Sequence, residues 1–119
     1  MTHPATRTGR QLAGDAGEDA ALAHLQRQGL TLVERNFRCR GGELDLIMRD
    51  GGTMVFVEVR KRAGSGFGGA AASIGPAKQA RLVKAAETWL QRYRMPPACR
   101  FDVIAIDGDA LSWLRNAIA

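Results

Sequence analysis

The feature that most constrains this chain is a hairpin signal, Asp-Gly-Gly-Thr, at residues 50–53. Runs with the alternation and β-branched content of strands lie on both sides of it, and a Gly-Gly centre is typical of a two-residue hairpin turn. With the two glycines as the loop, Asp50 pairs with Thr53, and each further pair lies one residue farther from the turn on both strands. This register sets Asp45 directly opposite Glu58.

Asp45 and Glu58 are therefore candidate metal ligands. Two like charges placed directly opposite each other in a sheet are destabilising, and a hard divalent cation, which prefers oxygen ligands, removes that repulsion. Glu18 is a third candidate, because its spacing from Leu22 and Leu25 places it on the inward face of an expected first helix. The alternative for Glu18 is a helix-start carboxylate at the edge of that apolar face.

The same region also has purely structural interpretations. Glu43 falls opposite Arg60 in the expected register, which favours a cross-strand ion pair. Arg60 shares a strand face with Glu58 and would simply neutralise it. Asp102 follows Arg100 by two positions, so Asp102 is a candidate ion-pair partner of Arg100 or of a loop arginine. Structural ion pairs and metal sites both produce such clusters, and the pattern alone leaves the alternatives open.

The order of the expected elements predicts an α/β fold. We expect a helix from Thr8 to about Gln28, strands at 31–38, 43–49 and 53–60, a helix beginning at Pro76, and strands at 101–106 and 111–114. The order α-β-β-β-α-β-β argues for one mixed sheet flanked by helices, in a single domain over residues 1–119. Residues 1–9 are expected to be mobile, and the Gly-, Ala- and Ser-rich residues 63–75 to form a flexible loop.

The charge balance points to a polyanionic partner. The formal net charge is +5 and the pI is near 10.0, which favours nucleic acid over the alternative of a soluble protein that is merely basic. The candidate phosphate contacts are the basic residues around the acidic pair, namely Arg38, Arg40, Arg60, Lys61, Arg62 and Lys78. For Lys78 the alternative is a solvated lysine in the first turn of the second helix.

Signals for membrane insertion and export are lacking in this sequence. No apolar run approaches the roughly 18 residues that span a membrane, and the N-terminus has no apolar segment of the signal-peptide kind. We therefore expect a cytoplasmic protein that does not enter the membrane. Cys39 and Cys99 are far apart, and they are expected to be reduced thiols rather than a disulfide or a zinc site.

The motifs together resemble a known family. Gly-Glu-Leu-Asp-Leu-Ile at 42–47 and Phe-Val-Glu-Val-Arg-Lys-Arg at 56–62 resemble the uncharacterised bacterial YraN-type family, as do Gly17-Glu18, the Arg-Asn-Phe-Arg run at 35–38 and the Arg-Phe-Asp run at 100–102. The resemblance covers about residues 10–107. That family looks like a branch of the restriction-endonuclease-like PD-(D/E)xK nucleases and is similar to Holliday junction resolvases, which implies a mixed central sheet with an αβββαβ core.

The resemblance also implies roles for individual residues. It assigns Asp45 and Glu58 as the carboxylates that bind Mg²⁺ or Mn²⁺, Glu18 as the helix glutamate of the resolvase-like branch, and Lys78 as a basic residue of the second core helix. One position departs from the motif, because Arg60 stands where a lysine is usual. Arginine keeps the positive charge, but it cannot act as a base and its geometry differs from that of an ammonium group.

Three functions follow as hypotheses. The first is a divalent-metal-dependent nuclease that acts on structured or branched DNA, with Arg60 stabilising phosphate charge. The second is a nucleic-acid-binding module whose nuclease site is catalytically degenerate. The third is a protein-interaction adaptor that uses the apolar residues 111–118 as a contact surface, a segment that would otherwise serve a homodimer.

Overall fold

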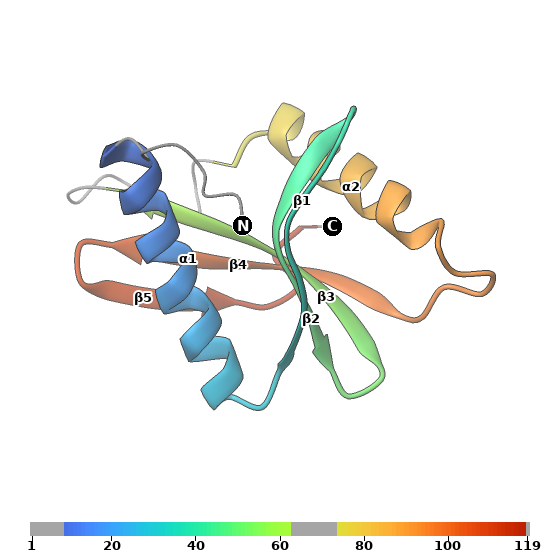
Figure 1. The fold of residues 1–119 in the computed structure, drawn as a ribbon, viewed down its shortest axis with the longest axis horizontal. Coiled ribbons are helices and arrows are strands. Elements are labelled where there is room, and N and C mark those ends of the chain that lie inside the picture. Colours follow the sequence, from blue (N-terminus) through green and yellow to red (C-terminus); the bar gives the residue numbers. More distant parts are fainter. Residues whose placement is uncertain (1–8, 63–73, 119) are drawn as a thin grey trace, which may run out of the picture.

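The computed structural model describes residues 9–62 and 74–118, with side chains described from 16 to 61 and from 74 to 118. Within these ranges two helices and five strands follow one another in the predicted order (Figure 1). Their bounds are α1 Gly9–Arg27, β1 Thr31–Cys39, β2 Gly42–Asp50, β3 Thr53–Arg62, α2 Pro76–Leu90, β4 Cys99–Asp107 and β5 Ala110–Leu114.

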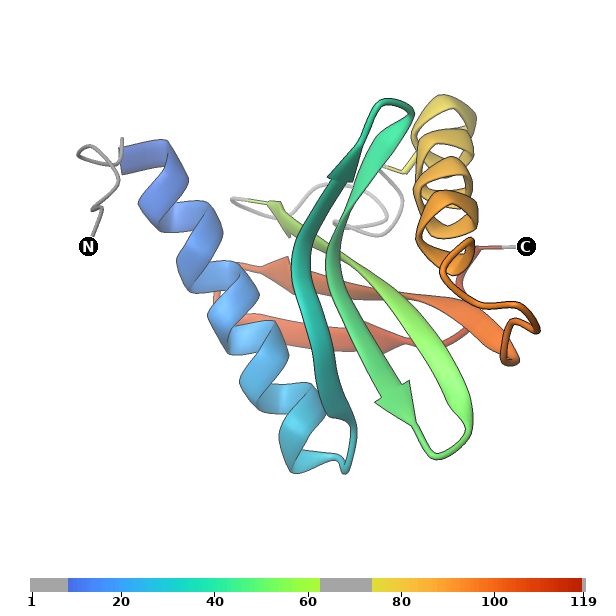
Figure 2. The same ribbon diagram turned by 45° about the vertical axis from the view of Figure 1, so that its right-hand side comes forward.

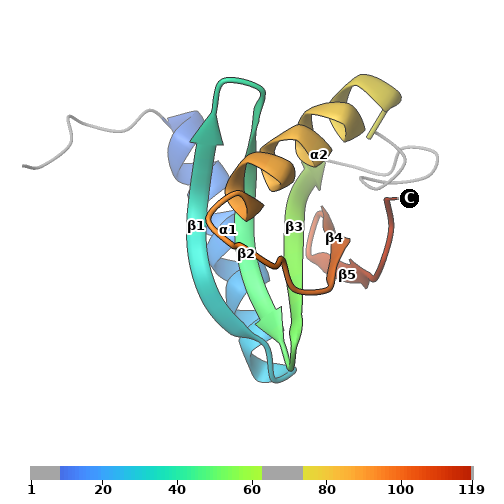
Figure 3. The ribbon, with the colours of Figure 1, turned by 90° about the vertical axis from the view of Figure 1, so that its right-hand side faces the viewer.

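The five strands form one mixed sheet in the order β1-β2-β3-β4-β5. Strands β3 and β4 are parallel, and every other neighbouring pair is antiparallel. The β2–β3 turn is the predicted one, because Asp50 pairs with Thr53 and Gly51 has a φ of +60°. Figure 3 shows α1 on one side of the strands and α2 on the other. The predicted mixed sheet flanked by helices is confirmed.

An apolar cluster on each face attaches a helix to the sheet. On the α2 side, Trp89 packs edge-to-face against Phe56 of β3, and its indole N–H donates to Glu34 Oε1 of β1 at 2.9 Å. On the α1 side, the cluster contains Ala21, Leu25, Leu30, Leu46, Met48, Val55, Val57, Ile104 and Ile106. Strand β4 contributes to both clusters, with Val103 on the α2 side and Ile104 on the α1 side. Burial on both faces accounts for the nearly continuous apolar sequence of this strand.

The turn between β1 and β2 lies directly against α2. A two-residue turn joins Cys39 to its partner Gly42. A Cβ added at Gly42 would overlap the backbone carbonyl of Arg81, and one added at Gly41 would overlap the side chain of Lys84. Figure 2 shows the tip of this hairpin beside α2. The two glycines thus allow a closer approach of hairpin and helix than any larger residue would.

Several expectations concern segments away from the sheet centre. Residues 1–8 of the expected mobile N-terminus and 63–73 of the expected flexible loop lie outside the described residues. Three apolar residues of the C-terminal segment pack against the body of the molecule, since Leu111 and Trp113 contact the α1-side cluster and Ile118 belongs to the α2-side cluster. The contact surface and homodimer expected from this segment stay predictions. In the described part of the chain, no helix has the length and apolarity needed to cross a membrane.

The close approach of hairpin and helix generates a stability prediction. We expect Gly42→Ala to lower the free energy of unfolding by about 1–3 kcal/mol, because the new methyl group forces α2 away from the hairpin. Gly52→Ala is the matched control, since its added Cβ meets nothing within 4 Å, and its stability should be unchanged or raised by up to about 1 kcal/mol. Urea denaturation of both variants measures the difference, and equal midpoints would contradict the prediction.

Candidate functional site

The ladder between β2 and β3 ends beside the predicted acidic pair. Its last pair is Leu46 with Val57, one step before the predicted pairing of Asp45 with Glu58. Beyond that point, the backbone N–H of Val59 donates to Asp45 Oδ2 at 2.8 Å. The Asp45 side chain therefore accepts from a backbone N–H that would bond to β2 if the ladder continued. Asp45 and Glu58 are neighbours, but they do not form a pair of the ladder.

The side-chain alternation of β2 reverses at Asp45. Leu44 packs in the α2-side cluster, whereas Leu46 packs in the α1-side cluster, although residues two apart share a face in a regular strand. Asn36 of β1, which falls opposite Asp45 in the register, has a φ of +54°. This left-handed conformation is uncommon for residues other than glycine and asparagine. The left-handed Asn36 and the reversal in β2 both occur where the Asp45 side chain reaches the backbone of β3.

Glu58 is buried, and only one of its oxygens is paired. Its side chain is 4% exposed, and Oε2 lies 3.6 Å from Arg60 Nη1 and 3.4 Å from Lys78 Nζ. Arg60 therefore does neutralise Glu58, as the structural interpretation of the sequence predicted, and Lys78 of α2 is a second cation beside it. The other oxygen, Oε1, is buried without a hydrogen-bond partner among the described residues. Buried polar atoms are normally bonded, so an unpaired one calls for an explanation such as a missing ligand.

The environment of Asp45 opposes its ionisation. Burial, followed by the negative charge of Glu58, raises the pKa of Asp45 from an ordinary 3.8 to about 7. The hydrogen bond from Val59 and the charge of Lys78 act in the opposite direction. Because two nearby carboxylates raise the pKa of one of them, a cation placed between the two would reverse the effect.

Glu18 lies near this pair but has its own partners. Its Oε1 accepts from Arg35 Nη2 at 3.3 Å. With the side-chain nitrogen of Asn36 turned toward it, that amide donates to both Glu18 oxygens at 3.1 and 3.2 Å. Burial and then the charge of Asp45 raise the pKa of Glu18, and Arg35 and Asn36 lower it. Asn36 thus connects the helix glutamate to the strand irregularity that accompanies Asp45.

The donor set suits a hard divalent cation. Asp45 and Glu58 offer only oxygen, and Mg²⁺ is typically held by one or two carboxylates together with water and substrate phosphates. The unpaired Oε1 of Glu58 supplies a free acceptor at this position. Across the described residues, no three carboxylate, imidazole or thiol groups converge closely enough to hold a metal ion. The fit therefore rests on the acidic pair, and the assignment of Glu18 as a ligand stays a prediction.

A second buried carboxylate, Asp102 of β4, has the opposite character. Arg100 Nε donates to both of its oxygens at 3.0 and 3.2 Å, Trp113 Nε1 donates at 2.9 Å, and the backbone N–H of Asn116 donates at 2.9 Å. Arg100 also donates to Asp50 Oδ2 at 3.1 Å. The predicted ion pair of Arg100 with Asp102 is confirmed. Because its acceptors are occupied, Asp102 is a structural residue that connects β4 to β5 and the C-terminal segment.

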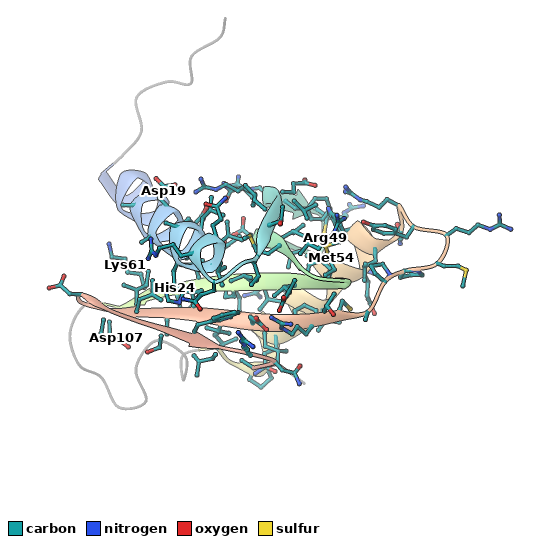
Figure 4. All side chains as sticks on the ribbon, turned by 90° about the horizontal axis from the view of Figure 1, so that it is seen from below. Asp19, His24, Arg49, Met54, Lys61 and Asp107 are labelled. Carbon is teal, nitrogen blue, oxygen red and sulfur yellow. The ribbon has the colours of Figure 1, made fainter. Side chains whose placement is uncertain are left out.

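The basic residues fall into separate groups. Glu43 pairs with Arg38 at 3.2 Å, so the predicted ion pair of Glu43 with Arg60 is wrong; the ladder ends before those two residues would meet. Lys61 lies along α1, with its Cδ 3.7 Å from the position of a Cβ on Gly17, and Figure 4 shows it on the α1 side of the sheet. The side chain of Arg62 lies outside the described residues.

An open pocket of about 400 Å³ collects the remaining basic residues between the β1–β2 hairpin and α2. Its charged lining comes from Arg38, Arg40, Glu43, Lys78 and Arg81. The pocket therefore brings together three of the predicted phosphate contacts and adds Arg81, which was not among the predicted phosphate contacts. The signal that would have found Arg81 is its three-residue spacing from Lys78, which places both on one side of a helix.

The chain is similar to known proteins of a single family. The profile of "Uncharacterised protein family UPF0102" matches residues 17–106. The UPF0102 protein HEAR0176 of Herminiimonas arsenicoxydans is 67% identical over 112 residues, covering 94% of this chain and 90% of the relative. The UPF0102 protein RALTA_A3032 of Cupriavidus taiwanensis is 61% identical over 109 residues, covering 91% and 83%. The chain belongs to the UPF0102 family, which confirms the YraN-type resemblance.

Asp45 and Asp102 should respond in opposite directions to the same isosteric change. We expect Asp45→Asn to raise the free energy of unfolding of the metal-free protein, because it removes the repulsion from Glu58 and keeps an acceptor for Val59. We expect Asp102→Asn to lower that free energy by about 2–4 kcal/mol, because one oxygen becomes a donor that faces other donors. Urea denaturation in the presence of a chelator measures both.

The pKa of Asp45 determines how the stability gained in Asp45→Asn depends on pH. Between 3.8 and about 7 the folded protein keeps the Asp45 proton and the unfolded chain loses it, so this group makes stability fall as pH rises through the window. The gain from Asp45→Asn should therefore be larger at pH 8 than at pH 5, by about 1–3 kcal/mol. A gain that does not change with pH would contradict the assigned pKa.

Proposed function

We propose that this chain is a divalent-metal-dependent nuclease that hydrolyses phosphodiester bonds in structured or branched DNA. The observation that carries the proposal is the acidic pair of half-buried Asp45 and buried Glu58, in which Glu58 has an unpaired oxygen and Asp45 has a strongly raised pKa. Strongly perturbed carboxylates that repel each other are costly to stability and are typical of functional sites. The net charge of +5 supports a polyanionic substrate.

The residues around the pair suit this chemistry. When bound, Mg²⁺ or Mn²⁺ would supply a water of lowered pKa and would offset charge on a phosphoryl oxygen. Asp45 is fixed in place by the Val59 N–H, and Glu58 is fixed by burial in β3. Arg60 and Lys78 would place positive charge beside a bound phosphate once Glu58 turns to the metal. Glu18, held by Arg35 and Asn36, would support the pair from the α1 side.

A second function is favoured by a different observation, which is that Glu58 already has two cations beside it. With Arg60 and Lys78 at 3.6 and 3.4 Å, its charge is balanced without a metal ion. A protein with this arrangement would bind nucleic acid through phosphate contacts and cleave nothing. Such binding would weaken steeply with salt and would not need divalent ions.

Metal titration separates the two functions. Isothermal calorimetry with Mn²⁺ should show a stoichiometric site in the natural sequence and no site in Asp45→Asn or Glu58→Gln. Asp109→Asn, which removes an exposed carboxylate in the β4–β5 turn, should leave the site unchanged. Absence of a site in the natural sequence would favour the binding module over the nuclease.

The arginine in the motif generates a prediction on cleavage. With branched DNA and Mn²⁺, Arg60→Gln should lower the cleavage rate by about 10²-fold or more, because it removes positive charge beside the reacting phosphate. Arg60→Lys should retain or raise the rate, since it restores the usual residue of the motif and keeps the charge. Equal rates for Arg60→Gln and the natural sequence would show that Arg60 takes no part in the reaction.

A further inference from the structure

The pocket between the β1–β2 hairpin and α2 has an excess of positive charge. Four basic side chains, Arg38, Arg40, Lys78 and Arg81, line it with a single carboxylate, Glu43. That carboxylate is already paired with Arg38 at 3.2 Å. Within the described ranges, neither Arg40 nor Arg81 has an ion-pair partner, and both are exposed. A concave surface with uncompensated charge of one sign concentrates ions of the other sign.

The walls of this pocket are fixed in place. The close approach of Gly41 and Gly42 to α2 sets the distance between hairpin and helix. The volume of about 400 Å³ falls within the range of pockets that bind small molecules, and it suits a nucleotide unit better than a lone ion. A preformed basic pocket of this size loses little conformational entropy on binding.

One residue, Lys78, connects the pocket to the acidic pair. Lys78 lines the pocket, and its Nζ also lies 3.4 Å from Glu58 Oε2. A strand whose phosphate lies at Asp45 and Glu58 would therefore pass Lys78 and enter the pocket with its next units. Arg40 and Arg81 stand on opposite walls, one on the hairpin turn and one on the helix.

We propose that this pocket binds a backbone phosphate of the nucleic-acid strand adjacent to the phosphate at the acidic pair, with Arg40 and Arg81 as its contacts, and that it does so without a metal ion. This inference takes only one point from the proposed function, which is that the ligand is a nucleic acid. It assigns a binding role to Arg81 and gives the strand a path from the carboxylates toward the β1–β2 hairpin.

The chain contains its own probe for this pocket. Its two cysteines lie at opposite ends of the sheet, since Cys39 lines the pocket and Cys99 pairs with Met54 beside the β2–β3 turn. The nine residues of β2 separate these ends by about 25 Å. Cys99 is exposed and Cys39 is half-buried, so the alkylation rate of each thiol is measured separately, in Cys99→Ser and in Cys39→Ser.

We expect a short DNA oligonucleotide, in the presence of a chelator and at low salt, to slow alkylation of Cys39 at least threefold and to leave Cys99 unchanged. Inorganic phosphate at the same total phosphate concentration should give no protection, because it makes one contact rather than several along a strand. Equal rates at Cys39 with and without saturating oligonucleotide would overturn the proposal, and protection by inorganic phosphate alone would overturn the assignment to a strand.

Salt dependence tests the two arginines. Arg81→Gln and Arg40→Gln should each reduce the slope of log binding constant against log salt concentration by about 0.7–0.9, the value for one phosphate contact. Arg49→Gln is the matched control, because Arg49 is exposed at the far end of β2 (Figure 4) and should leave the slope unchanged. An equal loss in all three variants would mean that only overall charge matters, which contradicts a defined pocket.

The outcomes also separate this proposal from the nuclease. If Asp45→Asn loses Mn²⁺ binding and cleavage but keeps Cys39 protection, the pocket binds nucleic acid independently of the metal site, as proposed. If no variant or natural protein cleaves DNA while protection persists, the nuclease proposal fails and the pocket proposal stands. If cleavage depends on Asp45 but Cys39 is never protected, the pocket proposal fails alone.

Discussion

The bond from the Val59 N–H to the Asp45 carboxylate is the contact on which the site depends. It occurs where β2 and β3 stop pairing, and it satisfies a backbone donor that would otherwise be lost from the ladder. In doing so it holds Asp45 near Glu58, where burial and like charge oppose ionisation. The local geometry of β3 therefore requires an acceptor at this point, and the chain supplies a carboxylate whose ionisation its surroundings oppose.

The two buried carboxylates of the sheet, Asp102 and Glu58, differ in how far their oxygens are satisfied. Asp102 has donors from a neighbouring arginine, an indole and a backbone amide, so burial leaves it little unsatisfied capacity. Glu58 has cations near one oxygen only, and the other has no partner in the described part of the chain. Natural proteins break the rule of satisfied burial mainly where a ligand is expected. Burial alone would not have distinguished the two residues.

Much of the fold follows from local sequence, and the irregular features of the site do not. The Gly-Gly turn, the order of elements and the β2–β3 register up to Leu46 were all predictable, because turn chemistry and period-two alternation act over a few residues. The end of that ladder, the left-handed Asn36 and the reversal at Asp45 were not, because the pairing rule assumes a regular strand. The predicted partner of Glu43 was wrong for the same reason, and the place of Arg81 in the pocket was not predicted because its neighbours there come from a distant hairpin.

The contact of Gly42 with the Arg81 backbone carries a consequence for how the family can vary. A side chain at position 42 is not compatible with the present position of α2, because its Cβ would overlap the Arg81 carbonyl. A relative with a larger residue there must move α2 outward, which would widen the pocket and carry Lys78 away from Glu58. Differences in this pocket among members would then arise through one backbone contact, with the acidic residues themselves unchanged.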